Sequence, residues 1–149
     1  MMGTESTPGC FTGDNNGGFM CEMLKYVEDH IYMFGILQNH IAPAAYWRDR
    51  TSQSAFDAYK KDSDFLAPIN NEIQHAKSAQ YKDRFSALNR LYLISFSYDT
   101  MVYPYQSPMF QDRKLGSNSV TTAVNDMTET EMYKNDSIGL KTLNEANKI

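Results

Sequence analysis

The chain has 149 residues, 42% of them hydrophobic and 13% aromatic, and this composition is typical of one globular domain rather than a disordered tail. Its net charge is -4 and its Lys and Arg residues form no stripe, so we expect no nucleic-acid partner. No stretch approaches the roughly 20 apolar residues of a membrane span. The opening sequence, MMGTESTPGC, lacks the apolar centre of a signal peptide, so we expect either a cytosolic protein or a missing amino terminus.

Two cysteines, Cys10 and Cys21, flank the polar, glycine-rich segment FTGDNNGGFM. A disulfide that closes so short a loop would stabilise the fold by roughly 3 kcal/mol. The alternative is a pair of unrelated thiols. Because the spacing fits neither a CxxC redox pair nor an array of Cys and His ligands, we expect no metal site and no cofactor.

The segment Phe19–Ile41 has the apolar spacing of a helix, and Pro43 prevents the helix from continuing. Its apolar face consists of Met20, Leu24, Val27, Ile31 and Phe34. His30 and His40 lie ten residues apart, without the four-residue step that brings two ligands to one metal. We interpret both as solvated or half-buried side chains, and His75, later in the chain, likewise has no evident partner.

The next fifty residues extend this mainly helical region. The polar segment 51–64 contains Phe56 and Tyr59 as isolated apolar contacts. The sequence FLAPINN follows, and we predict that it is extended because Pro68 is excluded from helix interiors. Helical spacing returns at Ile73 and continues through Tyr81 and Phe85 to Leu88 or Leu91, with His75 on the polar part of this helix. A helical region of about ninety residues is more typical of an insertion or cap than of a repeated βαβ sheet.

The stretch LYLISFSYDTMVYP, residues 91–104, changes character abruptly. Its first part, Leu91–Phe96, is a nearly uninterrupted run of β-favouring residues with the length of a buried strand. Asp99 follows directly, at the place where open α/β sheets carry their sites. An Asp after a strand most often closes a turn, and this role stays open beside the functional one.

Beyond Asp99 the chain is predicted to be rich in loops. Pro104 and Pro108 fix an aromatic loop, and residues 111–131 are polar and predicted to be mobile. The last segment contains one glycosylation sequon, formed by Asn135, Asp136 and Ser137. Such triplets also arise by chance, so Asn135 is a candidate for glycosylation and no more.

Several short motifs, in order, resemble the carboxyl-terminal half of the palmitoyl-protein thioesterase family. They are Cys10 and Cys21 as its short disulfide loop; Tyr46, Trp47 and Asp49 as its YWxD signature; Phe65, Leu66, Ala67, Ile69, Asn70 and Glu72 as FLADINxE; Tyr81 and Lys82 as a helix start; Asp99, Val102 and Pro104 as NDxxVxP; and Asp136, Gly139, Leu140 and Lys141 as DxxGLK. Each motif alone is weak, but their joint order and spacing are specific.

This resemblance implies a partial α/β-hydrolase fold within one partial domain, residues 1–149. A mainly helical inserted or cap region would cover residues 10–90, and a fragment of the hydrolase core would cover residues 91–149, with one core strand and a loop-rich tail. By resemblance, Asp99 is the acid of a Ser-His-Asp triad. The family's nucleophile lies earlier in a GxSxG-type elbow, which this sequence lacks, and its histidine lies later than Ile149.

The resemblance also implies an activity, namely hydrolysis of long-chain fatty acyl thioesters on protein cysteines, or depalmitoylation. The implied partner is a palmitoylated protein or long-chain acyl thioester, and the implied location is the lysosome or the exterior of the cell. With one triad residue of three, we expect the chain alone to be an inactive fragment. The alternatives are a non-catalytic module that binds acyl chains or a protein partner, and a small helical interaction protein of the cytosol.

Overall fold

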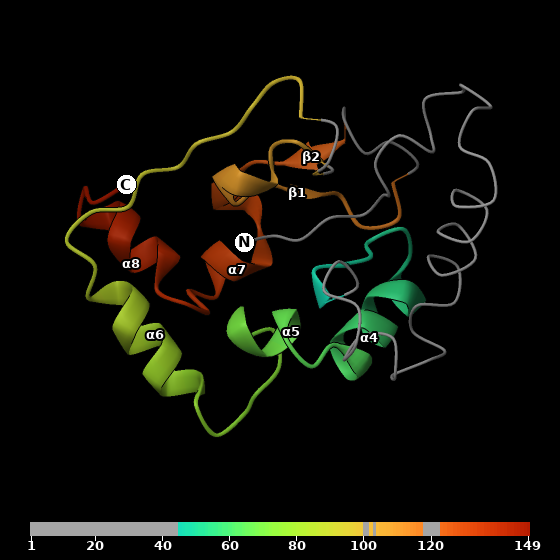
Figure 1. The fold of residues 1–149 in the computed structure, drawn as a ribbon, viewed down its shortest axis with the longest axis horizontal. Helices are drawn as coiled ribbons and strands as arrows, with labels where there is room; N and C mark the ends of the chain where they lie inside the picture. The colour runs from blue at the N-terminus through green and yellow to red at the C-terminus, as the bar shows by residue number, and fades with distance from the viewer. Residues whose placement is uncertain (1–44, 100–101, 103, 118–122) are drawn as a thin grey trace.

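The computed structural model describes residues 45–99, 102, 104–117 and 123–149. Its elements are α4 (Gln53–Asp62), α5 (Leu66–Ile69), α6 (Ser78–Ser86), η2 (Ser107–Met109), β1 (Asp112–Arg113), β2 (Val124–Asn125), η3 (Met127–Glu129), α7 (Glu131–Lys134) and α8 (Leu140–Glu145). Figure 1 shows α4 and α5 beneath the β1–β2 ribbon, with α6 beside α8. No helix among the described residues is long and apolar enough to cross a membrane. The predictions for Cys10, Cys21, His30, His40 and the helix at 19–41 lie outside the described residues.

The polar segment 51–64 contains the capped helix α4, and its Phe56 and Tyr59 are not isolated apolar contacts. Ser52 caps α4 because its hydroxyl accepts a hydrogen bond from the Ala55 amide at 3.1 Å. Phe56 and Tyr59, three residues apart, are buried on the same face of α4. They pack with Leu66 and Ala67 in a first hydrophobic cluster, completed by the partly buried Ile73.

The predicted extended conformation of FLAPINN is wrong, because Leu66–Ile69 form the short helix α5. Pro68 is compatible with this helix since it lies in the first turn, where a backbone amide has no acceptor within the helix. The Ser63 hydroxyl accepts hydrogen bonds from the amides of Leu66 and Ala67, at 3.1 and 3.2 Å. A side chain outside the helix therefore satisfies the amides that begin it.

The helix predicted from Ile73 to Leu88 is confirmed over Ser78–Ser86 as α6, whereas residues 73–77 precede the helix. The expectation that His75 lies on this helix without a partner is corrected. His75 Nε2 donates a hydrogen bond to the Pro68 carbonyl at 2.8 Å, and Lys77 N donates to Nδ1 at 3.3 Å. The imidazole ring also lies 5.1 Å from the Tyr81 ring, centroid to centroid. His75 therefore has a structural role, as it holds the connection between α5 and α6.

A second hydrophobic cluster joins α6 to the carboxyl-terminal helices. Its buried members are Phe110, Met132, Ile138 and Leu140. Gly139, at the start of α8, has φ of 89° and approaches α6 so closely that a Cβ atom would lie 1.8 Å from the Ser86 hydroxyl oxygen. Glycine is required here by both the backbone conformation and the close contact.

The run Leu91–Phe96 is not a buried strand in this structure. It has no regular secondary structure, and Leu91 and Leu93 pack on the second cluster while Tyr92, Ile94 and Phe96 are 68–76% exposed. Within the described part of the chain, no backbone amide of residues 92–98 donates a hydrogen bond to another backbone group. The side chains alternate as in a strand, but neighbouring strands are missing among the described residues.

The polar segment after Pro108 is better ordered than predicted, since β1 and β2 pair as an antiparallel ribbon. Asp112 in β1 is buried, and Asn125 donates to its carboxylate at 2.8 Å across the ribbon. Arg50 Nη1 lies 3.2 Å from the same carboxylate, and Arg48 Nη1 lies 3.5 Å from it. A buried charged residue therefore ties the ribbon to the segment that precedes α4.

The second partner of Arg48 is Glu72, whose carboxylate lies 2.6 Å from Nη2 and 2.9 Å from Nε. Glu72 also accepts a hydrogen bond from the Tyr59 hydroxyl at 2.5 Å. Burial lowers the pKa of Arg48, but attraction and hydrogen bonding to Glu72 outweigh burial and raise this pKa above its usual value. We refer to Arg48, Arg50, Glu72 and Asp112 as the buried ion cluster.

Replacing Asp112 by alanine is expected to lower the free energy of unfolding by about 3 kcal/mol, because it leaves Arg50 buried without its carboxylate partner. Urea unfolding at neutral pH measures this change. Asp57→Ala is the matched control, since it removes an exposed carboxylate that pairs with Lys60 at 2.9 Å. Equal unfolding midpoints for both variants would contradict a stabilising role of the cluster.

Candidate functional site

Asp99 lies in a turn at the end of the extended segment. Its carboxylate Oδ1 accepts a hydrogen bond from the Val102 amide at 3.0 Å, and its own amide donates to the Phe96 carbonyl at 3.0 Å. The side chain is half-buried. The Asp99 carboxylate therefore closes a turn of the chain through the amide three residues on, which is the structural role expected from the sequence.

The described histidine does not lie beside Asp99. The connection between α5 and α6, which contains His75, is at the bottom of Figure 1, whereas the segment that leads to Asp99 crosses the top. Both ring nitrogens of His75 already make hydrogen bonds at that connection. His75 is therefore not the base that a triad acid would orient.

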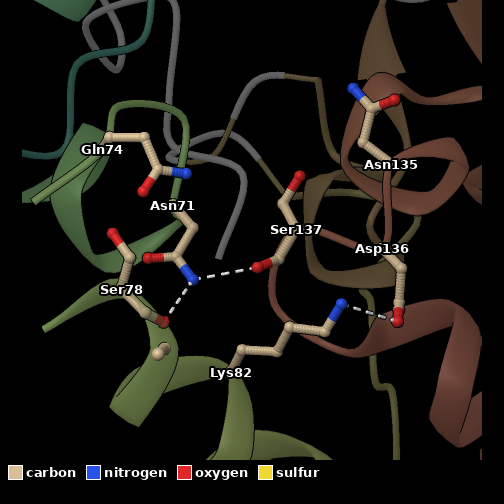
Figure 2. A pocket seen from close by; sticks show the side chains of 8 residues that line it. Asn71, Gln74, Ser78, Lys82, Asn135, Asp136 and Ser137 are labelled. Carbon is tan, nitrogen blue, oxygen red and sulfur yellow. Dashed lines mark hydrogen bonds and ion pairs between the residues drawn. The ribbon is translucent and has the colours of Figure 1, made fainter.

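A polar cleft of about 460 Å³ lies between α6 and the turn that joins α7 to α8. We call it the polar cleft, and it is lined by Asn71, Gln74, Ser78, Ala79, Lys82, Asn135, Asp136 and Ser137. Figure 2 shows the Asn71 amide between two carbonyl groups, and the Lys82 ammonium against the Asp136 carboxylate. No local pattern in the sequence indicates this cleft, because residues as many as 66 positions apart meet in it.

The floor of the polar cleft is fixed by Asn71, which adopts a left-handed conformation with φ of 51°. Its amide nitrogen donates to the carbonyls of Ser78 and Ser137, each at 2.9 Å. Its amide oxygen is buried and accepts no hydrogen bond. Asn71 thus holds α6 against the α7–α8 turn, and its one unused acceptor is closed off from solvent.

The wall of the polar cleft contains the only ion pair that the described residues place there, between Lys82 Nζ and Asp136 Oδ2 at 3.0 Å. Asp136 also accepts hydrogen bonds from the amide and hydroxyl of Thr142, at 3.1 and 2.7 Å. Partial burial raises the pKa of Asp136, but Thr142 and Lys82 together lower it below its usual value. The carboxylate is therefore held in its charged form.

A separate apolar groove of about 580 Å³ runs between α5 and α6. Its apolar lining consists of Tyr46, Phe65, Leu66, Ile69, Tyr81, Phe85, Leu88 and Ile138, with Asn70 and Arg84 as polar members. Ile69 and Phe65 remain 44% and 41% exposed. An open apolar groove with few polar groups is the type of surface that binds apolar ligands.

The described residues contain no group of three or more His, Cys, Asp and Glu side chains placed to hold a metal ion. The acidic residues of the buried ion cluster are engaged by arginines instead. Asn135, the candidate for glycosylation, is exposed at the end of α7. Cys10 and Cys21 lie outside the described residues.

Comparisons with known proteins give a family for the whole chain. The sequence model of the family described as palmitoyl protein thioesterase matches residues 1–149. Palmitoyl-protein thioesterase 1 of Caenorhabditis elegans is 35% identical over 148 residues, which cover 99% of this chain and 46% of the relative. Palmitoyl-protein thioesterase 3 of Dictyostelium discoideum is 33% identical over 113 residues, covering 76% of this chain and 37% of the relative.

A third relative is the lysosomal thioesterase PPT2 homolog of Drosophila melanogaster, 34% identical over 110 residues, which cover 74% of this chain and 35% of the relative. The chain thus spans less than half the length of these curated relatives. The family implies an α/β-hydrolase fold, and the helices and small sheet of the described residues are consistent with part of one.

Replacing Asp136 by asparagine is expected to lower the free energy of unfolding at pH 7 by about 1 kcal/mol, because charge-assisted hydrogen bonds are lost. The folded-state pKa is lowered, so this contribution is present above the unfolded pKa near 3.9. It disappears as pH falls through the lower folded pKa. Urea midpoints from pH 7 to pH 2 should therefore converge for the two proteins.

The matched control for this titration is Glu145→Gln, which removes a carboxylate from an exposed pair with Lys141 at 3.8 Å. Its unfolding midpoint should follow that of the original chain at every pH. A constant difference between Asp136→Asn and the original chain down to pH 2 would show that the Asp136 charge does not stabilise the fold.

Proposed function

The chain belongs to the palmitoyl protein thioesterase family, and from that premise we propose that it supplies Asp99 as the acid of a Ser-His-Asp triad. The reaction is hydrolysis of long-chain acyl thioesters on protein cysteines. The observation that carries the proposal is the position of Asp99, which follows an extended apolar segment directly in a chain matched by the family along its whole length.

In such a triad the acid acts through the histidine. A serine oxygen attacks the thioester carbonyl while the imidazole takes the serine proton, and the same proton then passes to the departing cysteine sulfur. The acid accepts a hydrogen bond from the other ring nitrogen and stabilises the imidazolium. The turn around Asp99 supports this role, because the Val102 amide holds Oδ1 in place at 3.0 Å.

The nucleophile and the base are not provided by the residues we can assign. The sequence has no GxSxG motif, and His75 is bound to Pro68 and Lys77. Triads lose nearly all their catalytic advantage when the nucleophile or base is removed. We infer that these 149 residues alone do not hydrolyse thioesters, and that the relatives' additional residues are required.

The same proposal gives the extended segment its place in the fold. Leu91–Phe96 would be a strand of the hydrolase core within residues 91–149, and residues 10–90 would form the helical inserted region. The support is the alternation of packed and exposed side chains, together with an apolar run typical of strands covered on both faces. Neighbouring strands would then bind the unused backbone groups of residues 92–98.

We further propose a lysosomal or secreted location, with a disulfide between Cys10 and Cys21. Relatives in fly and mouse are named lysosomal thioesterases, and that compartment is reached through an oxidising pathway. A mass measurement after thiol blocking would detect the disulfide. Two blocked thiols in protein taken from its native compartment would overturn this part of the proposal.

A second candidate function, non-catalytic binding of acyl chains, is favoured by the apolar groove between α5 and α6. Each buried methylene contributes about 0.8 kcal/mol, so a long acyl chain gains most of its affinity from apolar surface of this kind. The groove is open and largely apolar. Binding of an acyl chain requires no nucleophile, so the isolated chain is sufficient to test this function.

The role of Asp99 is tested in a chimera, in which this chain replaces the matched region of the Caenorhabditis elegans relative. The chimera should hydrolyse a palmitoyl thioester, and Asp99→Asn should lower kcat by roughly four orders of magnitude, because asparagine cannot stabilise the imidazolium. Asp57→Asn, at an exposed site on α4, is the control and should retain activity. An active Asp99→Asn chimera would exclude Asp99 as the acid.

The assignment of Leu91–Phe96 as a strand is tested with Ile94→Asp. Urea unfolding measures its effect on the free energy of unfolding in the isolated chain and in the chimera. In the isolated chain the change should be nearly neutral, since Ile94 is 68% exposed. In the chimera it should cost about 3 kcal/mol, because the carboxylate would be buried. Leu93→Asp, on the packed face, should destabilise both proteins. An Ile94→Asp chimera as stable as its parent would count against a covered strand.

Acyl-chain binding is tested by titrating the isolated chain with a fluorescent fatty acid. Leu88 and Leu115 are each 38% exposed, but only Leu88 lines the groove, so Leu88→Asp and Leu115→Asp form a matched pair. Leu88→Asp should weaken binding about tenfold, through loss of roughly two methylene contacts. Absence of saturable binding, or equal weakening by both variants, would rule out the groove as the binding site.

A further inference from the structure

The only sequon of the chain lies where a folded domain can accommodate a glycan. Asn135 caps the end of α7, and its amide nitrogen in the backbone donates to the Glu131 carbonyl at 2.9 Å. Its side chain is exposed and makes no hydrogen bond to the described residues. Attachment of a sugar to Asn135 Nδ2 would therefore break no contact of the fold.

Three other asparagine side chains in the described part of the chain make structural hydrogen bonds. Asn71 donates to two carbonyls, Asn125 donates to Asp112, and Asn144 donates to the Tyr133 hydroxyl at 2.8 Å. Those amides hold the structure together, so modification of any of them would remove a stabilising interaction. Asn135 is distinguished from them both by its sequon and by its unused amide.

The side chain of the third residue of the sequon, Ser137, likewise has no structural hydrogen bond to the described residues. Ser137 binds through its backbone, since its amide donates to the Met132 carbonyl at 3.0 Å and its carbonyl accepts from Asn71. Its hydroxyl makes no hydrogen bond to the described residues. Glycosylation of the Asn-x-Ser triplet requires this hydroxyl, and the fold does not.

The polar cleft begins at Asn135 and has the chemistry of a neutral sugar site. Its walls offer amide and hydroxyl side chains, those of Gln74, Ser78 and Ser137 among them (Figure 2). The Lys82 ammonium is paired with Asp136 at 3.0 Å, so it is neutralised rather than available to a phosphate. Hydroxyl and acetamido groups match this lining better than an anion does.

We propose that Asn135 carries an N-linked glycan and that its first N-acetylglucosamine residue rests in the polar cleft. The new covalent bond joins the sugar's anomeric carbon to Nδ2, which loses one proton to solvent. The bond between that carbon and the diphosphate oxygen of a lipid-linked oligosaccharide donor breaks, and the lipid diphosphate leaves. The inference rests on the proposed secretory route but not on thioester hydrolysis.

The modification is tested by expressing the full 149-residue chain behind a cleavable signal peptide in a eukaryotic secretory host. The chain should gain the mass of one glycan, and peptide-N-glycosidase F should remove it and convert Asn135 to aspartate. Ser137→Thr should keep the glycan, whereas Asn135→Gln and Ser137→Ala should lose it. Asn144→Gln is a control and should remain glycosylated. Secreted chain without the added mass, or with the mass retained in Asn135→Gln, would overturn the proposal.

Binding of the first N-acetylglucosamine residue in the polar cleft is tested by trimming the glycan to this one residue. Hydrogen exchange of the trimmed glycoprotein is then compared with that of Asn135→Gln. Amides of residues 74–82 should exchange at least threefold more slowly in the trimmed glycoprotein, while those of α4 should be unchanged. Equal exchange at residues 74–82 in the two proteins would show that the sugar does not bind in the polar cleft. Because the host imposes the secretory route and no activity is measured, either failure is distinguishable from failure of the proposed hydrolase function.

Discussion

The extended segment that ends at Asp99 imposes the constraint on which the account depends. Its inner face is fixed by Leu91 and Leu93 on a hydrophobic cluster, yet its outer face exposes Tyr92, Ile94 and Phe96. Its amides at residues 92–98 donate no hydrogen bond to a backbone group of the described residues, and no described strand lies beside it. Since an apolar strand is stable when both edges and both faces are covered, this segment has the form of a sheet component without its sheet.

The rest of the described structure is stabilised without that sheet. The buried ion cluster links the segment before α4, the end of α5 and the β1–β2 ribbon, through residues 24 and more positions apart. Gly139 and Asn71 then bring α6 against the α7–α8 turn. The helical part can therefore hold the extended segment in place, and with it the turn that positions Asp99.

Local patterns in the sequence predicted some of this structure and failed where distant residues decide it. The helix before Leu88 follows from apolar spacing, and the family motifs led to Asp99 and Gly139. The extended FLAPINN prediction ignored that proline suits a first helical turn, and the mobile segment contained Asp112, whose arginine partners lie some 60 residues earlier. The run Leu91–Phe96 has the composition of a strand, but pairing requires neighbours that composition does not provide.

We propose that this chain contributes a strand and an acid to a larger hydrolase, a role supported by its membership of the thioesterase family and by its coverage of less than half of its relatives. Hydrogen exchange of the amides of residues 92–98 measures that claim most directly, in the isolated chain and in the chimera with the Caenorhabditis elegans relative. The account predicts rapid exchange in the isolated chain and strong protection in the chimera. Equally rapid exchange in both proteins would contradict it.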